Sequence, residues 1–369
     1  MRIIFSGGGT LGPVMPLVAI FQELKNKHPE WEFLWVGTKK GQEKNIAAKY
    51  GLPFEYISSA KLRRYGSWQN LFAPFLFLVG FIQSWKLIKK FRPDLLISAG
   101  GFVSVPLHWA AWFLKKTTII HQQDIEIGLA NKLMARTADF ITTSFEHQKK
   151  NFSIDKTIWI GNPVRAGLLR GDKQAAMSHF DLDPNLLTVF VLGGGTGALS
   201  LNKLVTNNLV EFIRHCQVIH MTGKGKELSI PLFRGHPDDK FLRERYHPVQ
   251  FLDEDLLKNV LAAADLVVSR AGLSTLSELA VLGKPSVIVP IAKTHQIANA
   301  EYFSKRSGAI IFYEDSMGAV DFVKIVKGLL EDNHERLMIG HEMQKVMPRT
   351  ALQKMCLMIE EIAKNKGKI

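Results

Sequence analysis

Two glycine-rich segments, residues 6–12 and 193–198, each follow an apolar run and precede a helical pattern. They read Ser-Gly-Gly-Gly-Thr-Leu-Gly and Gly-Gly-Gly-Thr-Gly-Ala. Glycine at a strand-to-helix turn permits positive φ angles and close backbone approach. The N–H groups at the start of the following helix can then bind a phosphate or a sugar oxyanion. One such segment is equally compatible with a turn that binds nothing, but two in succession favour anion binding.

Neither glycine-rich segment matches a well-defined nucleotide fingerprint. No Gly-Lys-Ser/Thr follows either turn, as a P-loop requires. No acidic residue follows a second strand at the position that contacts ribose in dinucleotide-binding folds. The two segments therefore predict an anion site without naming its ligand.

A third candidate site spans residues 269–278, where a strand-like run ends in small residues and a helical pattern begins. Hydroxyls in this first part of the helix, together with its free N–H groups, suit a diphosphate. Glu278 can accept hydrogen bonds from two vicinal hydroxyls, such as those of ribose, or can form a local capping box with Thr275. A polar cluster at residues 294–300 follows the next strand. It favours the ligand, because ligands of open α/β sheets bind at the carboxyl ends of strands.

These turns lie within an alternation of strand-like and helical patterns that predicts α/β folding around parallel sheets. Strands are expected at residues 2–5, 32–37, 95–99, 117–121, 140–143, 158–161, 188–192, 218–221, 249–252, 266–269, 286–290 and 309–313. Helices are expected at residues 16–27, 42–50, 129–135 and 334–364, the last broken at Pro348. Residues 171–185 form a polar stretch that we expect to be less ordered.

The pattern predicts two doubly wound α/β domains, residues 1–165 and 166–369, joined near residues 163–187. The last helix is a candidate to pack back on the first domain. Of the 369 residues, 46% are apolar and 22% charged, which is ordinary for a globular protein. Only two cysteines occur, which excludes a disulfide framework and favours a reducing compartment.

The formal net charge is +13, and the first 165 residues hold 22 basic against 11 acidic side chains. This excess suggests an anionic partner. Residues 57–93 contain no acidic side chain, and basic residues flank an apolar run at 71–82 that is too short to span a membrane. The segment predicts an interfacial membrane anchor or, alternatively, a buried helix with a basic end. The expected membrane contacts are Trp68, Phe72, Phe75, Trp85, Lys86, Lys89 and Lys90.

The order and spacing of these motifs resemble the MurG family of bacterial N-acetylglucosaminyltransferases over nearly the whole chain. The motifs that carry the resemblance lie at residues 8–13, 100–106, 121–124, 161–165, 193–198, 270–278 and 295–300. It implies two Rossmann-like domains facing an interdomain cleft, the GT-B arrangement. It also implies inverting transfer of N-acetylglucosamine from UDP-N-acetylglucosamine to lipid I, giving lipid II, at the cytoplasmic face of the bacterial plasma membrane.

The resemblance also assigns residues. Glu278 would bind the ribose hydroxyls, Arg165 the phosphates, and Gln296 with His295 the sugar hydroxyls. The full set of implied substrate-binding residues is Thr10, Leu11, Gly12, Asp124, Arg165, Gly195, Thr196, Leu252, Leu273, Ser274, Thr275, Leu276, Ser277, Glu278, His295 and Gln296.

Several positions depart from the family pattern. The first loop usually reads Gly-Gly-Thr-Gly-Gly-His, but Leu11 and Pro13 replace its fourth and sixth residues, so the loop histidine is missing. The usual His-Glu-Gln-Asn is His-Gln-Gln-Asp at residues 121–124, and Thr196 stands in a loop that usually carries serine. These changes affect the acceptor side more than the donor side.

An inverting transfer needs a group that takes the proton of the acceptor hydroxyl. The candidates are Asp124, which we prefer, and His121, both at the end of one predicted strand. Their alternatives are a helix cap before Gly128 for Asp124 and a hydrogen-bonded structural role for His121. No Asp-x-Asp indicates a metal-dependent glycosyltransferase site, so no cofactor or metal is expected.

Other functions remain open at this point. They are a different GT-B enzyme, such as a glycolipid glycosyltransferase or a UDP-sugar 2-epimerase, and a non-catalytic binder of the lipid-linked precursor. Nucleic acid is not an expected partner, because no recognised nucleic-acid module interleaves the basic residues with aromatic ones.

Overall fold

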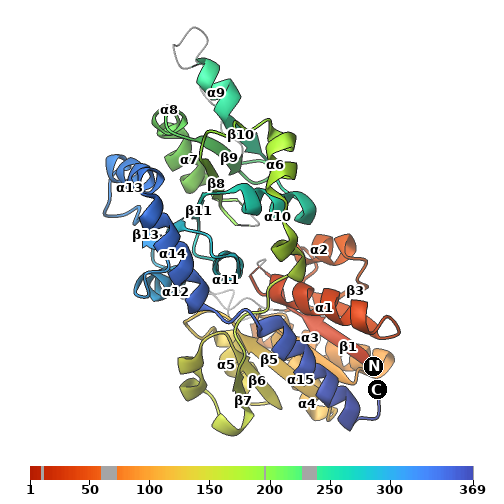
Figure 1. Ribbon diagram of the computed structural model, residues 1–369. Coiled ribbons are helices and arrows are strands. Elements are labelled where there is room, and N and C mark those ends of the chain that lie inside the picture. Colours follow the sequence, from red (N-terminus) through yellow and green to blue (C-terminus); the bar gives the residue numbers. More distant parts are fainter. Residues whose placement is uncertain (10–11, 60–72, 195–196, 227–238, 369) are drawn as a thin grey trace. The chain divides into compact units, whose positions relative to one another are not determined.

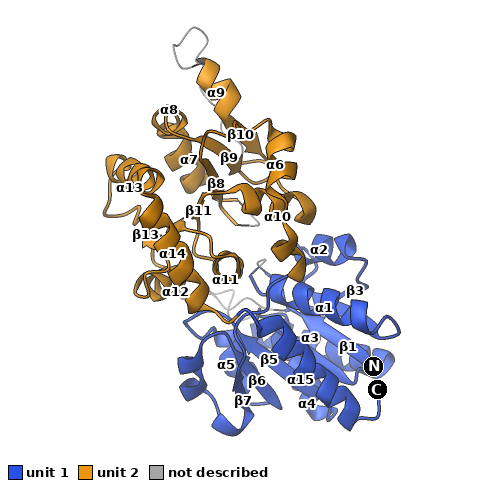
Figure 2. Ribbon diagram, in the orientation of Figure 1, with its two compact units in different colours: residues 1–165, 349–369 blue, residues 166–348 orange. Residues whose placement is uncertain are grey.

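The computed structural model describes residues 1–9, 12–59, 73–194, 197–226 and 239–368. It divides into two compact units (Figure 2). Unit 1 comprises residues 1–165 and 349–369, and unit 2 comprises residues 166–348. The predicted boundary after Arg165 agrees with this division, whereas the second domain ends at Pro348 and not at residue 369.

Unit 1 contains a seven-stranded parallel sheet in the order β3-β2-β1-β4-β5-β6-β7 (Figure 1). Its strands are β1 (Arg2–Ser6), β2 (Glu32–Gly37), β3 (Phe54–Tyr56), β4 (Leu95–Ser98), β5 (Thr117–Gln122), β6 (Phe140–Thr143) and β7 (Thr157–Trp159). Its α-helices are α1 (Met15–Lys27), α2 (Glu43–Lys49), α3 (Ala73–Phe91), α4 (Ser104–Phe113), α5 (Leu129–Ala135) and α15 (Ala351–Asn365).

Side chains of the unit 1 strands alternate between the two faces of the sheet. Ile3 and Phe5 of β1 lie in a cluster with α1 and α15, while Ile4 lies in a different cluster with α3 and α4. This alternation follows from the two-residue period of a strand. The sheet is therefore covered by helices on both faces, as the apolar strand sequences predict.

Unit 2 repeats the architecture with a six-stranded parallel sheet in the order β10-β9-β8-β11-β12-β13. Its strands are β8 (Thr188–Leu192), β9 (Gln217–Met221), β10 (Tyr246–Val249), β11 (Leu266–Ser269), β12 (Ser286–Ile288) and β13 (Ile310–Ile311). Its α-helices are α6 (Lys173–Phe180), α7 (Leu199–Asn207), α8 (Leu209–Ile213), α9 (Asp239–Arg245), α10 (Glu254–Ala263), α11 (Leu273–Leu282), α12 (Gln296–Ser304), α13 (Ala319–Glu331) and α14 (Asn333–Val346).

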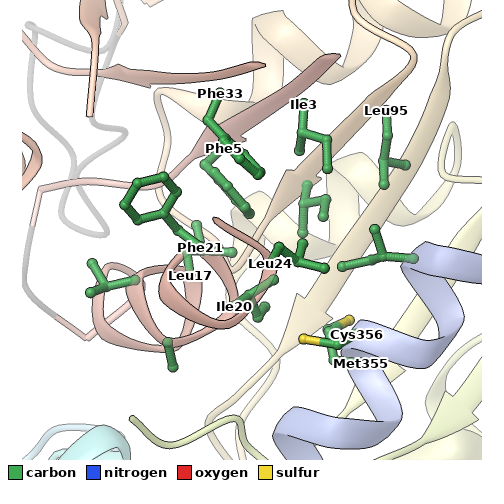
Figure 3. Packing of buried hydrophobic residues seen from close by; sticks show 14 of the residues in the cluster. Ile3, Phe5, Leu17, Ile20, Phe21, Leu24, Phe33, Leu95, Met355 and Cys356 are labelled. Atoms are coloured by element: carbon green, nitrogen blue, oxygen red, sulfur yellow. The ribbon is translucent and has the colours of Figure 1, made fainter. Parts of the chain in front are cut away.

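The C-terminal helix α15 belongs to the core of unit 1. Met355 and Cys356 lie against Ile20 and Leu24 of α1, beneath the strands (Figure 3). The chain leaves α14 at Val346, and α15 begins at Ala351, so the break expected at Pro348 is confirmed. The last helix packs back on the first domain because its apolar stripe completes that core.

Three element predictions were wrong or incomplete. Strand β3 was missed because three residues give too little periodicity. Residues 171–185 contain α6, which is capped by the Asp172 carboxylate and buries Ala176 and Phe180. Strand β10 occupies residues 246–249, three positions earlier than expected, and Pro248 within it is tolerated because β10 is an edge strand.

Candidate active site

The turn between β11 and α11 carries most of the expected donor-binding residues. Helix α11 begins at Leu273 with Gly272 as its N-cap, so Thr275 is not a cap and the capping-box alternative for Glu278 fails. Ser274 and Thr275 are half-buried, whereas Glu278 is 9% exposed. Ser274 and Thr275 lie in the first turn of the helix, where backbone N–H groups lack intrahelical partners, and Glu278 lies in the second turn.

Three other expected donor residues of α11 have their side chains in the core. Leu273 and Leu276 are buried, and the buried Ser277 hydroxyl donates to the Leu273 carbonyl at 2.7 Å. Their side chains therefore do not read a ligand. These residues can contact a ligand only through their backbone at the start of the helix.

Arg270 fixes the turn that precedes α11. Its buried guanidinium donates to the Val289 carbonyl at 2.9 Å and to the Glu314 carboxylate at 2.6 Å, and it also contacts the Ser200 hydroxyl. The Asn299 amide donates to the Ala271 carbonyl at 3.2 Å. These bonds tie the turn to α7, to α12 and to the residues that follow β12 and β13, although no individual role was expected for Arg270.

The second glycine-rich turn follows β8. Gly194 and Gly197 have φ angles of +80° and +67°, which favour glycine. A Cβ atom at Gly197 would also collide with the Thr222 carbonyl. The two expected ligand residues here, Gly195 and Thr196, lie outside the described residues.

The sugar-side residues follow β12. His295 is exposed, and Gln296 is the first residue of α12. The Gln296 side-chain oxygen accepts the Ile291 N–H at 3.2 Å, so half of this amide braces its own loop. Leu252, which follows β10, is buried.

The donor-side segments of unit 2 all lie at the end of its sheet that the carboxyl ends of the strands form. They follow β8, β10, β11 and β12, all parallel, so each lies at a carboxyl end. Strands β8, β11 and β12 are neighbours in the sheet order. The turns after them form the edge where ligands of doubly wound sheets bind.

In unit 1, His121 is fully buried in β5. Its Nδ1 lies 2.9 Å from the Thr142 hydroxyl, and its Nε2 lies 3.0 Å from the Asn162 side-chain oxygen. Burial lowers the pKa of the His121 imidazole to about 4, so the ring is neutral at neutral pH. The expectation that His121 contacts the acceptor is therefore corrected: it is a hydrogen-bonded structural histidine.

Asp124 follows β5 in a loop that neighbouring amides hold in place. The Gln122 and Gln148 side-chain amides both donate to the Asp124 carbonyl, at 2.7 and 2.6 Å. Gln122 in turn accepts from the Asn131 amide at 2.7 Å. Helix α5 begins at Leu129 with Gly128 as N-cap and no side-chain cap, so the alternative cap role of Asp124 fails.

The first glycine-rich turn follows β1 and packs against the turn after β4. A Cβ atom at Gly101, where φ is +93°, would lie 2.8 Å from the Gly8 carbonyl oxygen. Gly12 is half-buried, whereas Thr10 and Leu11 lie outside the described residues. Because β1, β4 and β5 are parallel neighbours, these turns and the Asp124 loop share one edge of the unit 1 sheet. Arg165, the last residue of the first stretch of unit 1, is buried.

Helix α3 presents an apolar face to solvent. Its inward stripe is made of Ala73, Gly80, Ser84 and Ile88, so the alternative of a fully buried helix fails. Phe75, Leu78 and Ile82 are 65%, 54% and 48% exposed, and Lys86, Lys89 and Lys90 are exposed further along the helix. Trp85 is half-buried beneath Lys89, whose Nζ lies 5.4 Å from the ring. The remaining expected contacts, Trp68 and Phe72, lie outside the described residues.

Part of this surface lies on α4, where no membrane contact was expected. Trp112 and Phe113 at the end of α4 are 50% and 55% exposed, and Phe113 meets Phe81 of α3 edge-on at 5.7 Å. Trp112 and Phe113 directly follow a run of buried helical residues, and this position in the sequence could have indicated that they extend the exposed surface. In the part of the chain that the structure describes, no helix combines the length and the apolar character needed to cross a membrane.

The Asp-x-Asp sequences of unit 2 serve local structure. Asp253 caps α10 by accepting the Leu256 N–H at 2.8 Å, and Asp183 accepts the Asn185 N–H at 2.8 Å. Among the described residues, no three His, Cys, Asp or Glu side chains gather as metal ligands.

Comparison with known proteins identifies the family. The family models for the N-terminal and C-terminal domains of glycosyltransferase family 28 match residues 3–143 and 188–356. A Bacillus cereus UDP-N-acetylglucosamine--N-acetylmuramyl-(pentapeptide) pyrophosphoryl-undecaprenol N-acetylglucosamine transferase is 33% identical over 338 residues, 90% of this chain and 93% of the relative. The transferase of the same name from Listeria monocytogenes is 36% identical, over 90% of this chain and 91% of its own.

The crystal structure of MurG from Acinetobacter baumannii has the same fold, with a TM-score of 0.72 at 20% identity over 98% of this chain and 99% of that one. The predicted GT-B class, with two Rossmann-like parallel-sheet units, is thus confirmed. The chain belongs to glycosyltransferase family 28, among the MurG-type N-acetylglucosamine transferases.

Proposed function

We propose that this protein transfers N-acetylglucosamine from UDP-N-acetylglucosamine to lipid I, giving lipid II for peptidoglycan synthesis. The observation that carries the proposal is the convergence of the family's donor motifs on one edge of the unit 2 sheet. Relatives 33–36% identical over about nine-tenths of the chain carry this activity in their names.

The donor occupies unit 2. The Glu278 carboxylate accepts hydrogen bonds from the two ribose hydroxyls. Its low exposure strengthens these charge-assisted hydrogen bonds, because little water competes for the carboxylate. The backbone N–H groups at the start of α11, with Ser274 and Thr275, face the diphosphate. The backbone near Leu252 contacts uracil, and the nitrogen of the Gln296 amide and the exposed His295 read the sugar.

The reaction forms one bond and breaks one. The acceptor hydroxyl oxygen attacks the anomeric carbon from the face opposite the diphosphate, and the bond from that carbon to the diphosphate oxygen breaks, releasing UDP. The hydroxyl proton passes to a base, for which we propose the Asp124 carboxylate. Hydrogen bonds from the side-chain amides of Gln122 and Gln148 to the Asp124 carbonyl hold the Asp124 backbone in place for this role.

The leaving diphosphate gains negative charge as its bond to the sugar breaks. We propose that the N–H groups at the start of α11 and the Arg165 guanidinium stabilise it, without a cofactor or metal. His121 supports the end of β5 through Thr142 and Asn162 and does not exchange a proton with substrate.

We propose that the protein is peripheral on the cytoplasmic face of the plasma membrane and contacts anionic lipid through α3 and α4. Supporting this are the exposed Phe75, Leu78, Ile82, Trp112 and Phe113, with lysines further along α3. Apolar side chains beside basic ones suit a lipid interface, where each basic residue near an anionic leaflet contributes about 1 kcal/mol.

Incubation with radiolabelled UDP-N-acetylglucosamine and a water-soluble lipid I analogue tests the proposal. We expect label in the acceptor and release of UDP. Acceptor binding without UDP release would instead identify a non-catalytic binder, and conversion of the donor without acceptor would identify a different enzyme of this fold.

A further inference from the structure

Glu43, the first residue of α2, is a buried carboxylate that the proposed reaction does not use. Its side chain is 1% exposed. Its Oε1 atom accepts the backbone N–H of Thr38 at 2.7 Å and the Thr38 hydroxyl at 2.6 Å. Burying a carboxylate is costly unless hydrogen bonds compensate it, so these bonds indicate a fixed position.

Three glycines surround the Glu43 side chain. A Cβ atom at Gly8 would collide with Oε1 and lie 2.6 Å from Cδ, and one at Gly37 would lie 2.7 Å from Cγ. A Cβ atom at Gly41 would collide with both carboxylate oxygens. None of the three has a positive φ angle. Any larger residue at these positions would therefore displace the Glu43 side chain, and at Gly37 also the Phe54 ring, whereas backbone conformation does not demand glycine there.

Gly8 is confined from a second direction as well. Gly101, in the turn after β4, approaches so closely that its Cβ atom would lie 2.8 Å from the Gly8 oxygen and 3.0 Å from the Gly8 nitrogen. The preceding Gly7 carbonyl accepts the Trp35 indole N–H at 3.1 Å. The backbone of the first glycine-rich turn is thus packed between Glu43 and Gly101.

We propose that Glu43 is a positioning residue for transfer: it clamps Gly8 and so fixes the first glycine-rich turn, which lies at the same end of the unit 1 sheet as the loop of the proposed base Asp124. The inference rests on the proposed function. Glu43 itself does not touch substrate, because it is buried beneath the turn. Its effect comes from shape and hydrogen bonding, because a glycine turn without a supporting side chain has many accessible conformations.

Substitutions at Glu43 separate this role from others. Glu43→Ala removes the clamp, and we expect kcat to fall by at least about tenfold, since small misplacements of reacting groups have large effects on rate. Glu43→Gln keeps the shape of the side chain and the oxygen that accepts the hydrogen bonds from Thr38. Its kcat should therefore stay within about threefold of the parent's. The donor Kd should change little in either variant, because Ser274, Thr275 and Glu278, which are proposed to hold the donor, belong to unit 2.

The contact with Gly8 allows a double-mutant cycle. Gly8→Ala alone forces a methyl group into the Glu43 carboxylate and should lower kcat. In a Glu43→Ala background that space is open, so the double variant should be no slower than Glu43→Ala alone, a non-additive result. Glu30→Ala, which removes an exposed carboxylate of unit 1, serves as the matched control.

The decisive experiment measures kcat, donor Kd and melting temperature for the parent, Glu43→Ala, Glu43→Gln, Gly8→Ala and the double variant. Parental kcat in Glu43→Ala, additive losses in the cycle, or equal losses in Glu43→Gln and Glu43→Ala would overturn the positioning role while the proposed function stands. A parent that transfers no sugar would overturn the proposed function, and the inference with it.

Discussion

At the scale of single residues, Glu278 shows how its environment determines a role. Its position in the second turn of α11, away from the N-cap, rules out local capping. Its carboxylate is only 9% exposed and follows the start of the helix, where we propose that the diphosphate binds. The sequence could not separate capping from binding, because the capping box needs the N-cap at Thr275, only three residues after the observed N-cap Gly272.

Glu278→Ala should weaken binding of UDP-N-acetylglucosamine. Each hydrogen bond between the carboxylate and a ribose hydroxyl contributes about 1.5–3 kcal/mol, so affinity should fall at least about tenfold. Titration calorimetry on the folded variant measures this. Glu331→Ala, at an exposed carboxylate of the same unit, is the control. Unchanged donor affinity in Glu278→Ala would remove Glu278 from the site.

Gln296 has one observed role and one proposed role, which a single substitution can separate. Its side-chain oxygen accepts the Ile291 N–H, and we propose that its side-chain nitrogen binds the sugar. Gln296→Glu keeps the acceptor and loses the donor. We expect it to narrow the rate difference between UDP-N-acetylglucosamine and UDP-N-acetylgalactosamine, because a lost donor no longer distinguishes hydroxyl orientation. A rate difference as wide as the parent's would show that Gln296 does not read the sugar.

At the scale of elements, α3 shows how one helix serves two environments. Its buried stripe consists of Ala73, Gly80, Ser84 and Ile88, whereas Phe75, Leu78 and Ile82 are exposed and lysines follow them. Residue spacing could not decide which of its apolar faces was buried. The answer depends on α4, whose exposed Trp112 and Phe113 extend the surface.

Replacing Lys86, Lys89, Lys90 and Arg92 with Gln should weaken binding to vesicles that contain anionic lipid. The parent should also dissociate as salt rises, because exposed charges are screened beyond about 10 Å at 0.1 M salt. Co-sedimentation over a salt series measures both effects. Gln substitutions at Lys305, Lys324, Lys327 and Lys345, in unit 2, provide a control with the same loss of four charges. A parent that stays in the supernatant with anionic vesicles at low salt would contradict the membrane proposal.

Sequence patterns predicted the long, buried elements well and the short, marginal ones poorly. Strands such as β1 and β8 are apolar on both faces and unmistakable, whereas β3 has three residues and β10 contains a proline. Helix α6 was missed because only one narrow side of it is buried. For the site, the motifs placed the donor turns, but the burial of His121 and the contact between Glu43 and Gly8 depend on packing between distant segments.

At the scale of the whole molecule, the chain crosses between its units twice, and its C-terminal helix completes the core of the unit in which the chain begins. The stability of unit 1 therefore depends on residues near the end of the sequence. Shared architecture alone does not fix the activity, since one fold supports many reactions.

Met355→Ala should destabilise unit 1 by about 2–5 kcal/mol, because it removes a fully buried side chain and leaves a cavity among α1, α15 and the strands. Leu357→Ala, on the same helix but 61% exposed, should have little effect. Chemical denaturation of both variants measures the difference. Equal destabilisation by the two substitutions would contradict the packing of α15 described here.

The central claim, sugar transfer to a lipid-linked acceptor, is tested most directly by mass spectrometry of the acceptor after incubation with UDP-N-acetylglucosamine. We predict that a lipid I analogue gains the mass of one N-acetylhexosamine and that one UDP appears for each acceptor converted. An acceptor of unchanged mass, with folded protein and bound donor, would contradict the account.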